Sequence, residues 1–249
     1  MVLSITGMHR SGTSLVASWL NLCGLILDQG RVIPPLIGNK KGFFEDLDFV
    51  LLQEKSIMQQ IPFSGGWKVT SSQELQFSKS ETKIAKEIIS LRQDQLDCDW
   101  GWKDPRTCLF LHQWKELIPD LKTIIVWRPC DQVVHSLIRR WTRKISRKLI
   151  LDSICAIRVW NAYNYSALNY ALCFPKDVII VPLERLLSND QAILDYVNDR
   201  FRLSLSHKSI QTVYEQEMLE QNPPGYLREI CSLLGNKKIE DRLLSWSPI

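Results

Sequence analysis

The residues best suited to chemistry lie near the start of the chain, in the segment GMHRSGTS from Gly7 to Ser14. Gly7 and Gly12 have the spacing of a phosphate-binding loop, G-x-x-x-x-G-K-[ST], but Thr13 occupies the position of the lysine. Backbone N–H groups in such a turn, and at the start of the following helix, bind phosphate oxygens. Arg10 adds a charged fork inside the turn. The segment therefore predicts an anion cradle whose cation precedes the second glycine.

The same loop carries hydroxyl donors and one residue that could act as a base. Ser11, Thr13 and Ser14 supply hydroxyl groups that can donate hydrogen bonds to an anion. His9 could contact a ligand or, in its neutral form, accept a proton. A histidine that only packs within the loop is an equally good interpretation, so both stay open.

A second candidate contact follows the apolar run at residues 123–127. Nucleoside triphosphatases commonly hold magnesium with an acidic residue at the end of a later strand, whereas this run ends at Arg128. A cation there indicates a second anionic group on the ligand and no metal ion. Ser136 lies about one and a half turns into the helix predicted to follow, and Asp131 is its predicted N-cap. Arg128 and Ser136 could therefore bind the same anion.

Apolar patterns predict the elements that position these residues. Three short runs rich in β-branched residues predict buried strands at residues 2–6, 123–127 and 177–182. Apolar residues at helical spacing occupy residues 15–22, 133–141 and 157–172. Strands interleaved with helices predict an α/β protein, a three-layer sandwich with a central parallel sheet.

The remaining stretches predict loops and a helical end within one domain. Residues 29–44 and 62–80 are rich in Pro, Gly or Ser and predict loops at the sheet edge, where ligands of open α/β sheets bind. From about residue 188 the pattern is helical, with an interruption at residues 222–225. Since no repeat or linker is visible, we expect a single domain over residues 1–249 with a large core.

Composition indicates which partners and which cellular compartment to expect. The net charge of +4, from 31 basic and 27 acidic residues, suits an anionic ligand and does not indicate a nucleic-acid partner. Seven scattered cysteines without C-x-x-C spacing favour a reducing compartment over a disulfide framework or a zinc site. Without a signal-type or spanning segment, we expect a cytoplasmic protein with no membrane partner. The basic run at residues 139–148 predicts a solvated helix face, or alternatively a patch that attracts a polyanion.

The two anion motifs together resemble the sulfotransferases that use 3′-phosphoadenosine-5′-phosphosulfate (PAPS). The resemblance rests on GMHRSGTSL and on WRPCDQVVHS, in which arginine and serine stand eight residues apart, each on a strand-plus-helix unit. GFFED (42–46) and GWKDPR (101–106) resemble segments of the small bacterial branch, and VPLERLL fits more weakly. The resemblance implies the sulfotransferase fold, with a P-loop-like 5′-phosphosulfate loop.

The resemblance also implies roles for the ligand-binding residues. The 5′-phosphosulfate would be bound by Arg10, Ser11, Gly12, Thr13 and Ser14, and the 3′-phosphate by Arg128 and Ser136. PAPS would be the co-substrate and adenosine 3′,5′-bisphosphate (PAP) the product, without a metal. The acceptor would be a hydroxyl of a small molecule, since compact bacterial members often tailor natural products. A cyanobacterial alkaloid pathway is a hypothesis that no residue here establishes, and an amine acceptor stays open.

Three residues are candidates for the chemistry beside Arg10 and His9. Glu45 resembles the catalytic glutamate of some members, whereas an acidic charge at a helix start, with Asp46 as the cap, is the alternative. Asp104 is the second candidate base, or else a turn residue and partner of Arg106. Lys103 resembles the family lysine that reaches the sulfonate or the bridging oxygen. Its alternative is an ordinary surface lysine.

Two other functions compete with this interpretation. A metal-dependent small-molecule kinase of P-loop type is disfavoured by Thr13 and Arg128. A non-catalytic nucleotide- or nucleic-acid-binding module is disfavoured because no aromatic RNA motif or recognition helix is present. Trp67 and Trp100 lie in loop-like contexts and could line an acceptor pocket. The oligomeric state is not predicted.

Overall fold

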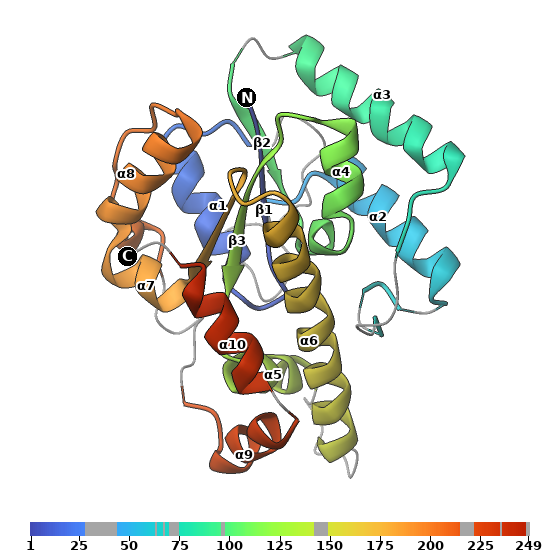
Figure 1. Cartoon of the computed structure of the whole chain (residues 1–249), viewed down its shortest axis with the longest axis vertical. Helices are drawn as coiled ribbons and strands as arrows, with labels where there is room; N and C mark the ends of the chain where they lie inside the picture. The colour runs from blue at the N-terminus through green and yellow to red at the C-terminus, as the bar shows by residue number, and fades with distance from the viewer. Residues whose placement is uncertain are drawn as a thin grey trace.

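The computed structural model contains four parallel strands in the order β2-β1-β3-β4 (Figure 1). It describes residues 1–27, 44–62, 64–66, 68–69, 75–95, 98–141, 149–214, 222–234 and 236–247. The strands are β1 (Val2–Thr6), β2 (Trp100–Lys103), β3 (Lys122–Trp127) and β4 (Val178–Pro182). The three predicted strands and the parallel sheet are therefore confirmed. Because β1, β3 and β4 are covered on both faces, they are almost wholly buried and rich in apolar and β-branched residues.

Helices cover both faces of this sheet and make the α/β sandwich that the sequence predicts (Figure 1). The helices are α1 (Thr13–Leu22), α2 (Leu47–Gln60), α3 (Lys79–Gln95), α4 (Leu111–Leu117), α5 (Cys130–Trp141), α6 (Leu149–Cys173), α7 (Leu183–Ser188), α8 (Asp190–Phe201), α9 (Gly225–Leu233) and α10 (Asn236–Ser245), with short 3₁₀ helices η1 (Pro105–Leu109) and η2 (Ile210–Thr212). One face packs against α1, α7 and α8. The other packs against α5, α6, α9 and α10.

Strand β2 was not predicted, and its position corrects one expectation. Its sequence WGWK is short and contains glycine and lysine, so its apolar pattern does not stand out. Gly101 is required there, because a Cβ would lie 2.3 Å from the carbonyl oxygen of Leu3 in the neighbouring strand. Trp100 is 4% exposed in this strand and belongs to the core. The prediction that Trp100 lines an acceptor pocket from a loop is wrong, and Trp67 lies outside the described residues.

Helix boundaries differ from the sequence expectations in two places. Helix α5 begins at Cys130, so Asp131 lies in its first turn and is not the N-cap. The stretch expected to be a loop at residues 62–80 ends in α3, which carries buried Ile88 and Ile89 on one side. Of the basic run, residues 142–148 lie outside the described part. None of the helices in the described part is long and apolar enough to cross a membrane.

Candidate functional site

The carboxyl ends of three neighbouring strands bring the predicted site residues to one edge of the sheet. Strand β1 leads into the glycine loop, β2 ends at Lys103, and β3 leads into Arg128. Lys103 pairs with Ile5 in the strand register, one residue before Thr6. Because the chain leaves β1 for β2 on one side and continues through β3 and β4 on the other, this edge is a topological switch point, where ligands bind in open α/β sheets.

The glycine loop has the backbone of an anion cradle. Gly7 and Gly12 have φ values of 139° and 93°, and Arg10 also adopts a left-handed conformation with φ of 72°. A Cβ on Gly7 would lie 2.0 Å from the carbonyl oxygen of Val126, so only glycine fits beside β3. Helix α1 begins at Thr13, as predicted. Its N-terminal N–H groups therefore open beside the loop and fit a phosphate or sulfate oxygen.

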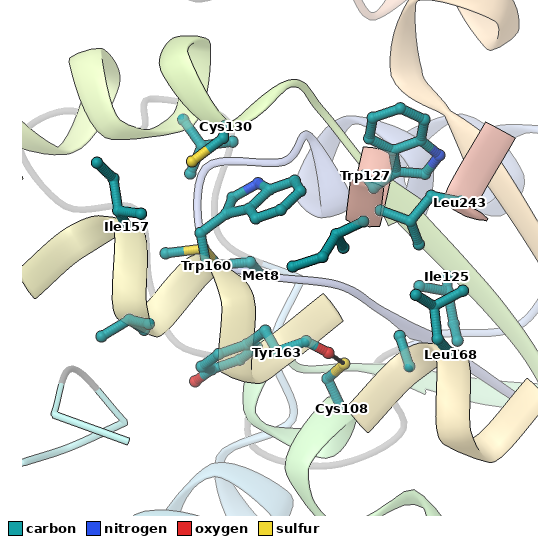
Figure 2. Packing of buried hydrophobic residues seen from close by; sticks show 14 of the residues in the cluster. Met8, Cys108, Ile125, Trp127, Cys130, Ile157, Trp160, Tyr163, Leu168 and Leu243 are labelled. Carbon is teal, nitrogen blue, oxygen red and sulfur yellow. Dashed lines mark hydrogen bonds between the residues drawn. The ribbon is translucent and has the colours of Figure 1, made fainter. Parts of the chain in front are cut away.

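The core anchors this loop and the Arg128 segment. Met8 is 1% exposed and packs in the same cluster as Trp160 and Ile125 (Figure 2). The indole N–H of Trp160 donates to the carbonyl oxygen of Arg128 over 3.1 Å. Since Trp160 belongs to α6, this helix fixes the backbone of both motifs. Sequence analysis predicted a helix over residues 157–172 but did not detect this role of Trp160.

The structure brings the two predicted anion motifs into direct contact. Arg10 Nε donates to Ser136 Oγ over 2.9 Å, from the loop to α5. Arg128 Nη1 donates to the carbonyl oxygen of Arg10 over 3.2 Å. Arg128 Nε and Nη2 both donate to Gln132 Oε1, over 3.2 and 3.1 Å. The guanidinium of Arg128 is therefore held against the loop, between the two motifs.

Electrostatics at this junction favour an anion. Arg128 is 5% exposed, and burial together with the nearby charge of Arg10 lowers the pKa of Arg128 to about 10. The buried guanidinium of Arg128 and the half-buried Arg10 repel each other, and a bound anion offsets that repulsion. Ser11 and Thr13 are buried in the cradle, whereas His9 and Ser14 are half-buried. The residues present therefore fit a ligand with more than one anionic group.

Glu45 and Lys103 form a buried ion pair, although 58 residues separate them. Lys103 Nζ lies 2.7 Å from Glu45 Oε1, and the two residues are 1% and 8% exposed. The alternative that Lys103 is an ordinary surface lysine is wrong. Asp46 is the N-cap of α2, because its side chain accepts a bond from the backbone N–H of Asp48. This is the cap that the alternative to a catalytic Glu45 expected. A carboxylate and an ammonium are thus held together at the carboxyl end of β2.

Asp104 and His9 have structural contacts of their own. Asp104 is fully buried, and its Oδ1 accepts 2.9 Å bonds from the backbone N and from Nη1 of Arg106. Its Oδ2 accepts a bond from Gln53 Nε2 over 2.8 Å. This is the turn-and-partner arrangement that the sequence analysis kept as the alternative. The ring of His9 meets the edge of Tyr163 at a centroid distance of 5.9 Å.

Sequence analysis missed Arg92, which binds beside Glu45. Arg92 Nε and Nη2 donate to the two carboxylate oxygens of Asp46 over 2.9 and 3.0 Å, and Nη2 also donates to Asp48 over 2.7 Å. Arg92 lies on α3, which was not predicted. The expectation that Asp46 caps a helix was the one sequence signal near this contact. A helix cap does not indicate which cation binds its carboxylate.

Comparisons with known proteins give a fold and no close relative. No family model matches the sequence, and no curated protein matches it. The structure is similar to sulfotransferase STF9 from Mycobacterium avium, with a TM-score of 0.55 and 12% identity, covering 97% of this chain and 76% of that one. It is also similar to the sulfotransferase domain from the curacin biosynthetic pathway, with a TM-score of 0.51 and 15% identity, covering 94% and 96%. A third match is the sulfotransferase domain of the Synechococcus PCC 7002 olefin synthase, with a TM-score of 0.50 and 15% identity, covering 92% and 82%. The chain therefore has the fold of these sulfotransferases, as the sequence predicted.

Proposed function

We propose that this protein is a sulfotransferase that transfers the sulfuryl group of PAPS to a hydroxyl of a small-molecule acceptor and releases PAP. The observation that carries the proposal is the contact between the two anion motifs, through the bond of Arg10 to Ser136 and that of Arg128 to Arg10. A nucleotide with phosphates at both its 3′ and 5′ positions requires two such cradles side by side. The shared fold supports the same function.

The donor would be held by the loop and by α5. Arg10, the loop hydroxyl groups and the N-terminus of α1 would bind the 5′-phosphosulfate. Arg128 and Ser136 would bind the 3′-phosphate. When bound, PAPS supplies an activated sulfuryl group. The chain's part is to fix both ends of the donor and to neutralise its charge.

The Glu45–Lys103 pair provides the groups that the transfer needs. Glu45 would accept the proton of the acceptor hydroxyl as its oxygen forms the new bond to sulfur. Lys103 and Arg10 would stabilise the negative charge that develops on the sulfonate and on the leaving phosphate oxygen. His9 is the alternative base because it lies in the loop itself.

The proposal also includes the class of acceptor and the cellular compartment. Two structural neighbours are sulfotransferase domains, one from the curacin biosynthetic pathway and one from an olefin synthase, which supports a natural-product acceptor. The scattered cysteines without C-x-x-C spacing support a reducing, cytoplasmic setting.

Thermal unfolding with three nucleotides tests the donor assignment. PAP at about a hundred times its dissociation constant should stabilise the protein by about 2.7 kcal/mol. ADP and ATP with magnesium, at the same concentration, should give smaller shifts because they lack the 3′-phosphate. A larger shift with ATP and magnesium would instead support the kinase. Strong binding of random oligonucleotides without a PAP effect would support the nucleic-acid-binding module.

A further inference from the structure

Glu45 and Lys103 are each followed by an aspartate that begins a helix. Asp46 Oδ1 accepts a bond from the backbone N of Asp48 over 3.0 Å at the start of α2. Asp104 Oδ1 accepts the equivalent bond from the backbone N of Arg106 over 2.9 Å at the start of η1. In both places an aspartate side chain fixes the backbone immediately after a residue of the ion pair.

An arginine binds each of these aspartates. Arg92 from α3 donates to both carboxylate oxygens of Asp46, and the two residues are 4% and 3% exposed. Arg106 donates to Asp104, which is fully buried, and also to Glu54 of α2. We call these the Asp46–Arg92 clamp and the Asp104–Arg106 clamp. Helix α2 belongs to both, because Asp46 caps it and Glu54 lies on it.

Stability alone is a poor explanation for two buried clamps. Removing charges from water is costly, and apolar residues of similar size often stabilise a core as well as a buried ion pair does. The planar fork of arginine, in contrast, fixes a carboxylate in direction as well as in distance. Phe44, just before Glu45, has φ of 50°, a conformation that non-glycine residues rarely adopt. The backbone of Glu45 is therefore constrained on both sides, by Phe44 before it and by the Asp46–Arg92 clamp after it.

We propose that the two clamps position Glu45 and Lys103 for sulfuryl transfer. Arg92 and Asp104 are then positioning residues, which act through the backbone and do not contact the reacting atoms. Asp104 already uses both carboxylate oxygens in bonds to Arg106 and Gln53, so it supports Lys103 and is not the base. This inference rests on the proposed function.

Kinetics of the variants Arg92→Met and Asp104→Asn test the positioning role. Each should lower kcat on the order of 10–100-fold, because small displacements of reacting groups have effects of this size. The KM for PAPS and the affinity for PAP should change little, because the two anion cradles are untouched. Arg92→Lys keeps the positive charge and should have a higher kcat than Arg92→Met. If Arg92→Met does not fold, Arg92→Lys takes its place in the comparison with the wild type. Adding Glu45→Gln to Asp104→Asn should lower kcat further, because Glu45 still accepts the proton in Asp104→Asn. No further loss would make Asp104 the base and overturn its assignment here.

Asp177→Asn is the matched control. Asp177 is a partly buried carboxylate that accepts bonds from Lys115 and Lys122, and it precedes β4 at the opposite edge of the sheet. Its replacement should lower stability but leave kcat unchanged. An equal loss of kcat in this control would mean that lowered stability explains the clamp variants, and the proposal would fail.

A chemical readout separates this inference from the proposed function. The Lys103 amine is 1% exposed and should be methylated slowly by formaldehyde with a borohydride reductant, as followed by mass spectrometry. Arg92→Met should speed the methylation of Lys103, whereas Asp177→Asn should not. Unchanged methylation in Arg92→Met overturns the clamp proposal whatever the activity. If methylation of Lys103 is faster in Arg92→Met but the protein does not bind PAP, the clamp proposal stands and the proposed function is wrong.

Discussion

At the scale of single residues, Arg128 is the cation that follows β3 and contacts the glycine loop. Its guanidinium is buried beside Arg10, and burial together with that charge lowers the pKa of Arg128 to about 10. The residue still carries its charge at neutral pH. Burial beside a second cation disfavours the charged form of Arg128, so the arrangement favours a ligand that brings negative charge.

Replacing Arg128 with alanine should weaken PAP binding by about 1.5–3 kcal/mol, the contribution of a charged hydrogen-bonding partner. Isothermal titration calorimetry measures this difference. Arg139→Ala is the control, because it removes an exposed cation from the same helix. Unchanged affinity in Arg128→Ala would remove Arg128 from the site, and an equal loss in Arg139→Ala would indicate a general charge effect.

Replacing Glu45 with glutamine should leave PAP affinity intact and slow sulfuryl transfer by roughly a hundredfold or more, because the amide cannot accept the proton. Steady-state kinetics with a turned-over acceptor, beside PAP titration of the same preparation, gives both quantities. Normal turnover would exclude Glu45 as the base and move that role to Asp104 or His9.

At the scale of elements, β1 and β3 lie so close together that no side chain fits at Gly7, the first residue of the glycine loop. Gly7 touches the backbone of β3, with a hypothetical Cβ 2.0 Å from the oxygen of Val126. Gly12 has its own constraint, since a Cβ there would lie 2.5 Å from the side chain of Leu183 at the start of α7. The cradle is therefore shaped by its neighbours as well as by its own sequence.

Gly7→Ala should destabilise the protein more than Gly24→Ala. Both glycines have positive φ, 139° and 110°, so alanine strains the backbone at either position by about 1–3 kcal/mol. Only Gly7 adds a clash, because a Cβ on Gly24 has no atom within 4 Å. Denaturant unfolding compares the two variants, and PAP binding should be lost only in Gly7→Ala. Equal stabilities would show that β3 does not press on the loop.

At the scale of the whole molecule, the C-terminal helices are joined to the glycine loop and to the start of α5. The backbone N–H of Cys130, at the start of α5, donates to Glu240 Oε1 of α10 over 2.8 Å. Arg228 of α9 lies 3.3 Å from Asp131. The cluster that contains Met8 and Trp160 also contains Leu243 of α10. The last helices thus share a core with the glycine loop.

Leu243→Ala should therefore destabilise the whole protein, as a single-domain chain requires. Leu243 is fully buried, and such truncations cost about 2–5 kcal/mol. The neighbouring Leu244 is 43% exposed, so Leu244→Ala should have little effect. Denaturant unfolding followed by tryptophan fluorescence and by circular dichroism should give one coincident transition that moves as a unit. Two separate transitions would contradict the single domain.

The sequence by itself determined the parts of the site that depend on neighbours in the chain. Glycine spacing and a β-branched run predicted β1, the loop and the start of α1 at Thr13. The apolar run before Arg128 predicted β3 and placed that cation at a strand end. These features were readable because turn geometry and strand burial impose local patterns on residue type.

Only the tertiary structure decided which distant side chains meet. Glu45 pairs with Lys103 across 58 residues, and Asp46 pairs with Arg92 across 46. Strand β2, which carries Lys103, is too short and too mixed for its pattern to predict it. Charged residues are common in any chain, and sequence spacing does not indicate which of them the packing of α2, α3 and the sheet will enclose. The partners of a buried charge are fixed by that packing, because burial without a partner is too costly to persist.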